Sequence, residues 1–135
     1  MSKQHIQPSQ LFPSDRFGFT QVVTSPPGKL VFVAGQVAFD QELKLVGGSD
    51  LGAQAQQALA NLAVALEAAG ASPSDVTMLR TFIVDYKPEY AGLIAPHMKA
   101  FLGGASPPAS TLLGVQSLAA PGLLIEIDAV AVVAG

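Results

Sequence analysis

The chain has 135 residues, which is the length of one domain with room for a hydrophobic core. Half of the residues are hydrophobic and 13% are charged, where about 25% is usual for a globular domain. The net charge is −3, the seven Lys and Arg residues are scattered from Lys3 to Lys99, and Cys is absent, which argues against a nucleic-acid partner, disulfides and a Cys nucleophile.

So few charged residues leave too little polar surface to cover a lone subunit. We therefore expect a homo-oligomer that buries apolar surface between subunits, and the alternative is a small Ala-rich monomer. The N-terminus lacks the apolar segment of a signal peptide, and no run reaches the roughly 18 apolar residues of a membrane span. A cytoplasmic protein without a membrane partner is the expectation.

The first third of the chain predicts an arm and two strands. Residues 4–15 contain two X-Pro pairs and are typical of an extended arm. Residues 17–24 and 30–37 are rich in β-forming residues, and the Pro-Pro-Gly sequence between them favours a hairpin loop. Gly35 in the second strand suggests a bulge or a close neighbour.

The middle of the chain predicts two helices around a strand. Asp50 is a candidate N-cap, apolar residues then recur at three- and four-residue spacing, and Gly70 is a candidate C-terminal cap. Gln54 falls on another face of this helix. Residues 76–84 predict a strand and residues 88–102 a second helix, in which Pro96 predicts a kink or an early break.

The last thirty residues predict two further strands, 107–115 and 124–132, joined as a long-loop hairpin by a Pro-Gly turn. Glu126 and Asp128 lie two residues apart in the otherwise apolar last strand, so both point to one face of the sheet. That face is either wetted by solvent or part of a site. The strands and helices together predict a single α+β domain over residues 1–135, with two helices packed on one face of a mostly antiparallel sheet.

Five segments in this order resemble the YjgF-like Rid family, the reactive-intermediate imine and enamine deaminases that are also described as endoribonuclease L-PSP-like. The resemblance covers nearly the whole chain. It implies a chorismate-mutase-like fold, a homotrimer with the helices outside a central barrel, and three ligand clefts between neighbouring subunits. The segments that carry it are residues 31–36, 57–70, 81–85, 108–111 and 125–132.

The resemblance also implies a site and a departure from it. Deaminating members begin the strand with Pro-Ala-Arg-Ser, and that Arg is thought to hold the carboxylate of a 2-imino acid. Here Ser110 stands in its place and offers neither the charge nor the two-pronged hydrogen bonding of a guanidinium. Glu126 matches the carboxylate that positions or activates the hydrolytic water. Phe19 stands where the family usually has a Tyr, so it keeps the ring but lacks the hydroxyl. Ala95 and Gly114 match positions that are often polar in the family.

The expected ligand cleft is lined by Phe19, Gly35, Ser110, Thr111 and Glu126. With one cation lost and one carboxylate kept, it should favour neutral or cationic ligands over anionic ones. Arg80 or Arg16 could replace the missing cation, although a surface or interface role is the more common one for an Arg in a strand.

Other residue chemistry is sparse. His5 and His97 stand alone without a second ligand at metal spacing, no base is spaced for a nucleophilic Ser110, and neither metal nor cofactor is expected. Three functions remain open. They are a metabolite-binding trimer without 2-imino acid deamination, a hydrolase of altered substrate in which Glu126 directs water, and a structural or partner-binding trimer.

Overall fold

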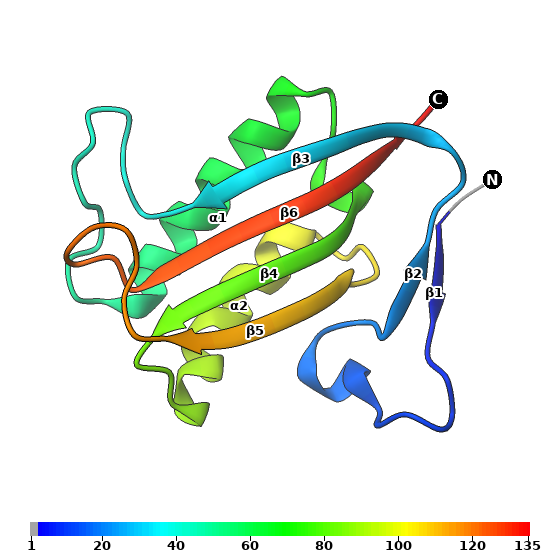
Figure 1. Ribbon diagram of the computed structural model, residues 1–135, viewed down its shortest axis with the longest axis horizontal. Helices are drawn as coiled ribbons and strands as arrows, with labels where there is room; N and C mark the ends of the chain where they lie inside the picture. The colour runs from blue at the N-terminus through cyan, green and yellow to red at the C-terminus, as the bar shows by residue number, and fades with distance from the viewer. Residues whose placement is uncertain (1–2) are drawn as a thin grey trace.

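The computed structural model describes residues 3–135 as one sheet with two helices and a short N-terminal ribbon (Figure 1). Three 3-10 turns, η1 (Ser14–Phe17), η2 (Pro73–Asp75) and η3 (Pro88–Tyr90), connect these elements. The strands and helices are β1 (Gln4–Ile6), β2 (Val22–Thr24), β3 (Gly28–Gln36), α1 (Leu51–Ala68), β4 (Val76–Val84), α2 (Ala91–Leu102), β5 (Ala109–Val115) and β6 (Ile125–Ala134).

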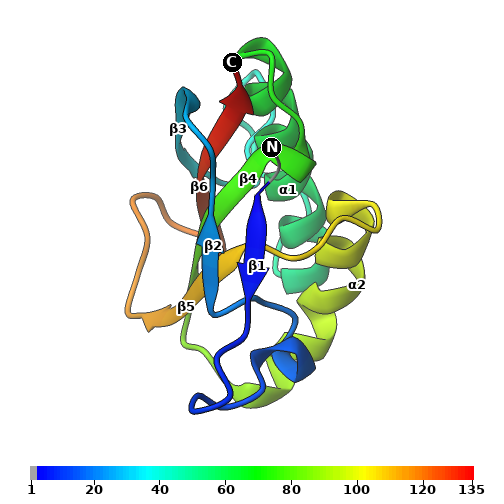
Figure 2. The same ribbon diagram turned by 90° about the vertical axis from the view of Figure 1, so that its right-hand side faces the viewer.

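The main sheet has the strand order β3-β6-β4-β5. β6 runs antiparallel to β3 and to β4, whereas β4 and β5 are parallel. Both helices lie on one side of this sheet and leave the other side open (Figure 2). The predicted α+β arrangement, with helices on one face of a mostly antiparallel sheet, is confirmed.

The predicted C-terminal hairpin is wrong, because β5 and β6 are not neighbours. β5 pairs with β4 and forms an edge of the sheet, while β6 lies between β3 and β4. The connection over residues 116–124 is longer than the two to five residues that favour hairpins, so it lets β6 pass to the far side of β4. β6 is long and alternates buried with half-buried residues, which suits a central strand.

The predicted hairpin across residues 25–29 is also wrong. β2 pairs with β1 in a separate two-stranded ribbon, and β3 pairs with β6. Pro26 and Pro27 favour an extended backbone over a tight turn, and they direct β3 away from β2. The arm expected over residues 4–15 therefore holds one strand of this ribbon and leads into η1.

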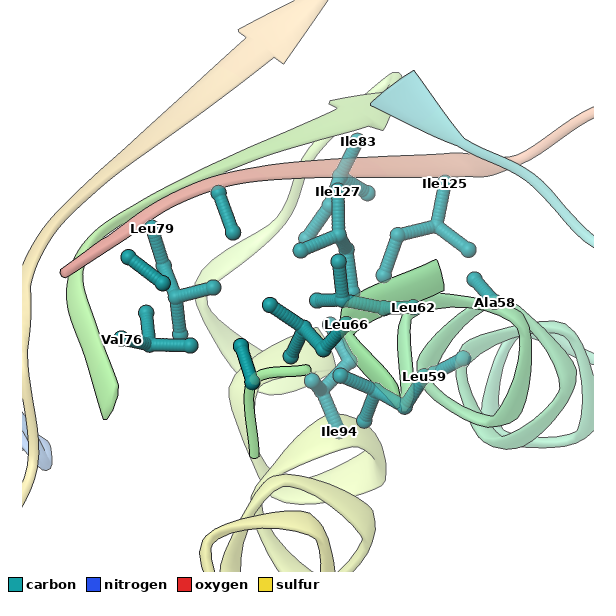
Figure 3. Close-up of a cluster of buried hydrophobic side chains, with 14 of the residues drawn as sticks. Ala58, Leu59, Leu62, Leu66, Val76, Leu79, Ile83, Ile94, Ile125 and Ile127 are labelled. Atoms are coloured by element: carbon teal, nitrogen blue, oxygen red, sulfur yellow. The ribbon is translucent and has the colours of Figure 1, made fainter. Parts of the chain in front are cut away.

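The helix α1 forms where its caps predict it. The Asp50 side chain accepts a hydrogen bond from the Ala53 N–H at 3.1 Å, and Gly70 beyond the helix end has a positive φ of 76°. Its apolar stripe packs against β4 and β6 to form the core, which Ile94 of α2 completes (Figure 3). The fully buried residues at the centre of the core are Leu62, Leu66, Leu79, Ile83, Ile125 and Ile127.

Gln54 lies on the buried face of α1, contrary to the prediction. Its amide nitrogen donates to the carbonyl oxygens of Gly48 and Gly122 at 2.7 and 2.8 Å. Its amide oxygen accepts from the N–H of Leu124 at 2.9 Å. A glutamine on a helix usually indicates a solvent-exposed position, but here all its hydrogen bonds go to loops that pack over the helix. One side chain therefore ties the loop before α1 to the loop before β6.

Pro96 does not break α2, which continues to Leu102. The ring removes one backbone donor, so the carbonyl of Gly92 loses its helical partner. Gly92 and Pro96 are both exposed, so this carbonyl is not buried without a partner. Ile94 is the one buried residue of this helix. Of the two predicted effects of Pro96, a kink or an early break, the early break is wrong.

The N-terminal ribbon is held against the body of the protein by Lys3. The Lys3 ammonium donates to the carbonyl oxygens of Ser74 and Val76. Beside it on β1, His5 has a buried Nε2 atom with no hydrogen-bond partner among residues 3–135. Burial lowers the pKa of His5, and the nearby Lys3 charge lowers it further.

This arrangement predicts that acid weakens the protein through His5. The pKa of His5 is lower in the folded state than in the unfolded chain, so the unfolded state takes up this proton first as the pH falls below about 6.5. The contribution of His5 to the free energy of unfolding should then be constant above that pH and become destabilising below it. The measurement is the denaturation midpoint at pH 7.5 and pH 5.5 for wild type and His5→Gln. An equal acid-induced loss in both proteins would contradict the prediction.

None of the helices within residues 3–135 is both long enough and apolar enough to cross a membrane.

Candidate ligand cleft

Gly35 and Glu126 are brought together where β3 ends and β6 begins. The pairing of β3 with β6 slips between Val33 and Gln36, so the bulge expected at Gly35 is present. A methyl group on residue 35 would overlap the Glu126 carboxylate, so the missing side chain of Gly35 makes room for it. The residues that the structure describes give this carboxylate neither a hydrogen bond nor an ion pair, so its oxygens are free to accept from a ligand or water.

Phe19 and Ser110 are brought together at the start of β5. Thr20 forms a parallel bridge with Ala109, and its N–H donates to the Pro108 carbonyl oxygen at 3.0 Å. From this pairing the Cα atoms of Phe19 and Ser110 are about 8 Å apart, using standard strand spacings. Ser110 pairs with Leu79, whose side chain is in the core, so Ser110 points to the side of the sheet that carries the helices.

These two pairs do not meet within one chain. Glu126 lies in the row of Phe82 and Leu113, which is two strands and three residues away from Ser110, or roughly 14 Å between Cα atoms. Glu126 also points to the open face, opposite to Ser110. The end of β3 and the start of β5 lie toward different ends of the sheet in Figure 1. A cleft that contains both pairs needs a second subunit.

Thr111 and Gly114 have surroundings that the sequence did not indicate. Thr111 is exposed and pairs with Arg80 on the open face of the sheet, so it points away from Ser110. A methyl group at residue 114 would come within 2.9 Å of the Tyr86 Cβ atom. The close approach of Tyr86 explains the glycine at that position by packing.

Arg80 is engaged by a carboxylate of its own chain. Its guanidinium makes two contacts with Asp128, Nη2 to Oδ2 at 2.9 Å and Nε to Oδ1 at 3.0 Å. The hydrogen bond that Arg80 donates to Asp128, followed by the Asp128 charge, raises the pKa of Arg80. Arg80 would have to give up this pair in order to hold a ligand carboxylate. It therefore does not replace the missing cation in this conformation.

The other cations do not form a basic surface. The Lys29 ammonium donates to the Ala69 carbonyl oxygen at 2.6 Å, at the C-terminal end of α1. The Lys87 ammonium lies 3.9 Å from the Asp85 carboxylate. Arg16 is exposed on η1 beside Asp15, and within residues 3–135 its guanidinium has no ion pair. Residues 3–135 therefore present no clustered positive charge of the kind that binds phosphates.

The open face of the sheet is apolar around the Arg80–Asp128 pair. Phe32 and Leu30 on β3 are 73% and 59% exposed, and Leu113 on β5 is 45% exposed. Met78, Phe82, Val130 and Val132 fill the space between them and are half-buried. Large exposed apolar surfaces of this kind mark interaction sites. The sequence indicated them only through the low share of charged residues.

Sequence reasoning also missed an aromatic cluster between β1 and β2. The rings of Phe12 and Phe17 and those of Phe12 and Phe19 pack edge to face with centroids 6.0 Å apart. Three Phe residues within eight positions were visible in the sequence, but no periodicity showed whether they belong to the core. Among residues 3–135, no three His, Cys, Asp or Glu side chains gather in a way that could hold a metal ion.

The topology and the bulge at Gly35 define an α+β protein of the YjgF/Rid fold class. Over 98% of this chain and 100% of the other, the fold matches a Yersinia pestis protein of unknown function of the conserved Rid family, YyfB, with a TM-score of 0.93 and 46% identity. It also matches a Mycobacterium tuberculosis member of the YjgF/YER057c/UK114 family, with a TM-score of 0.64 and 30% identity over 98% of this chain and 100% of that one.

The family model of the endoribonuclease L-PSP proteins matches residues 12–133. The protein DfrA of Myxococcus xanthus is 32% identical over 84% of this chain and 84% of its own. A RutC family protein of Pyrococcus abyssi is 32% identical over 77% of this chain and 79% of its own. The chain therefore belongs to the endoribonuclease L-PSP family, the group also called YjgF/Rid.

Proposed function

We propose that the protein is a homotrimer whose clefts between subunits bind a small neutral or cationic metabolite, without hydrolysing 2-imino acids. The observation that carries this proposal is the separation of Phe19 and Ser110 from Gly35 and Glu126 within one chain. A cleft with both pairs is completed by a second copy, and the apolar open face of the sheet supplies a surface for association. Membership of the Rid family supports the same assembly.

The chemistry of the two halves supports the preference for uncharged or cationic ligands. Ser110 contributes a hydroxyl where the resemblance implies a guanidinium, and Arg80 is held by Asp128. Glu126 brings a negative charge to the other half. A ligand carboxylate would therefore lose charge-assisted hydrogen bonds worth about 1.5–3 kcal/mol each and would be repelled by Glu126.

The proposal predicts little ammonia release from 2-iminobutyrate generated in situ. Ser110→Arg restores the side chain that could hold the substrate carboxylate, so this variant should release ammonia faster than wild type. Val64→Arg is the matched control, because Val64 is 68% exposed on α1, away from the open face and from the proposed cleft. Ammonia release by wild type at the rate of an Arg-bearing family member would contradict the proposal.

A hydrolase of altered substrate is the second candidate, and it is favoured by the Glu126 carboxylate beside Gly35, which has no hydrogen bond or ion pair among residues 3–135. A carboxylate without protein partners is able to accept a proton from water and direct the water onto an imine, enamine or amide. Under this candidate, Glu126→Gln abolishes turnover but keeps ligand binding. A trimer that binds none of these compounds would instead be structural or would bind a partner.

The family name refers to ribonucleases, but the part of the chain that the structure describes offers RNA no basic stripe, and we propose no nucleic-acid partner. Its cytoplasmic location stays a prediction.

A further inference from the structure

The three rings of Phe12, Phe17 and Phe19, here called the aromatic trio, form a cluster that reaches the start of β5 through the half-buried Phe19. Phe12 is 57% exposed and Phe17 is 72% exposed, so these rings are not part of the core. They lie on the segment between β1 and β2, away from the apolar open face that a second copy would cover. The bridge between Thr20 and Ala109 fixes Phe19 at the start of β5.

Hydrogen bonds within the segment between β1 and β2 hold the aromatic trio in place. The buried Ser14 hydroxyl donates to the Phe19 carbonyl oxygen at 2.7 Å, and it also lies 3.0 Å from the Gln7 amide oxygen. That amide oxygen accepts from the Gln21 N–H at 3.0 Å, and the Gln21 amide donates to the Phe12 carbonyl oxygen at 3.1 Å. These hydrogen bonds order the loop that carries the rings, so ligand binding loses little conformational entropy of the loop.

The charges around the aromatic trio cancel. Asp15 and Arg16 lie in the same 3-10 turn and carry opposite charges. The amides of Gln7 and Gln21 are uncharged. An apolar floor with a few polar groups at its rim is the usual composition of a site for a small organic molecule.

We infer that the aromatic trio is the apolar wall of the proposed cleft and that the ligand carries an aromatic or similarly bulky apolar group next to its neutral or cationic head. This inference rests on the proposed function, because it assigns the trio to the half of the cleft formed by Phe19 and Ser110. The rings receive the apolar group by edge-to-face or offset contacts. The polar head lies toward Glu126 of the neighbouring copy.

The test compares two neutral amides, propionamide and 3-phenylpropionamide, by ligand-detected NMR titration of the full chain. The phenyl group should tighten binding roughly tenfold, the size of effect that one buried aromatic contact gives. Phe17→Ala should remove most of this gain, and Phe17→Leu should keep part of it. Val64→Ala is the control, since Val64 is 68% exposed on α1, outside the site, and its removal should leave the gain unchanged.

Several results would overturn the inference. A phenyl group that gives no gain while propionamide binds would show that the trio lies outside the cleft, and the proposed function would stand. If the phenyl group tightens binding equally in Phe17→Ala, or if neither amide binds, the assignment of the aromatic trio as the apolar wall would be contradicted. Dissociation of the assembly in Phe17→Ala would make the trio a subunit contact. If 3-phenylpropionate instead binds tighter than its amide, and Arg16→Gln removes that preference, the proposed neutral cleft fails while the apolar wall remains.

Discussion

Gln54→Leu should lower the free energy of unfolding by about 3 kcal/mol or more. The substitution keeps most of the side-chain volume but leaves the carbonyl oxygens of Gly48 and Gly122 and the N–H of Leu124 without the partners they have now. These three hydrogen bonds are part-buried, and each contributes about 1 kcal/mol net to stability. A domain has only about 5–15 kcal/mol of stability, so this loss would be a large share of it.

The measurement is chemical denaturation at one fixed protein concentration, because association also contributes to apparent stability. Gln56→Leu is the matched control, since Gln56 is exposed on the same helix. A surface substitution of this kind usually changes stability by no more than about 0.5 kcal/mol. Equal effects of the two substitutions would show that the Gln54 hydrogen bonds contribute nothing to folding.

Glu126→Gln should remove most of the preference for a neutral ligand over its acid. The protein should bind an amide about 10- to 100-fold tighter than the matching 2-oxo acid, as expected for two carboxylates within a few ångströms in a partly dry site. Calorimetry with such a pair gives this ratio for wild type and variant. Tighter binding of the acid, unchanged in Glu126→Gln, would contradict the proposed electrostatics.

Gly35→Ala tests the same site without a change of charge. The added methyl group overlaps the Glu126 carboxylate and must displace it. This variant should therefore also reduce the preference for the amide. Gly92→Ala is its control, because a methyl group on that exposed helical residue meets no neighbour within 4 Å. Wild-type ligand ratios in Gly35→Ala would show that the position of the carboxylate does not matter.

Local signals predicted the elements well, because their causes are local. Asp50 and Gly70 mark the ends of α1, and the alternation of apolar residues predicts β6. Strand partners depend on residues far apart in the sequence, so neither predicted hairpin was found. The loop over residues 116–124 and the Pro pair before β3 fit crossing connections as well as turns, and only the packed sheet decides between them.

The candidate site was predictable only in part. Strand alternation places Glu126 on an open face, but its proximity to Gly35 depends on the pairing of β3 with β6. Gln54 and the aromatic trio were missed because amides and rings occur both in cores and on surfaces. The distance between Ser110 and Glu126 follows from the position of β5 at the sheet edge. The expected hairpin had instead placed β5 next to β6.

The central claim is that the cleft forms between copies of the chain, and the molar mass in solution tests it most directly. Light scattering after gel filtration should give about three times the chain mass of 13.8 kDa. Phe32→Asp, which places a charge on the apolar open face, should reduce this mass toward that of one chain, whereas Val64→Ala should not. A wild-type protein that stays monomeric at micromolar concentration would contradict the account.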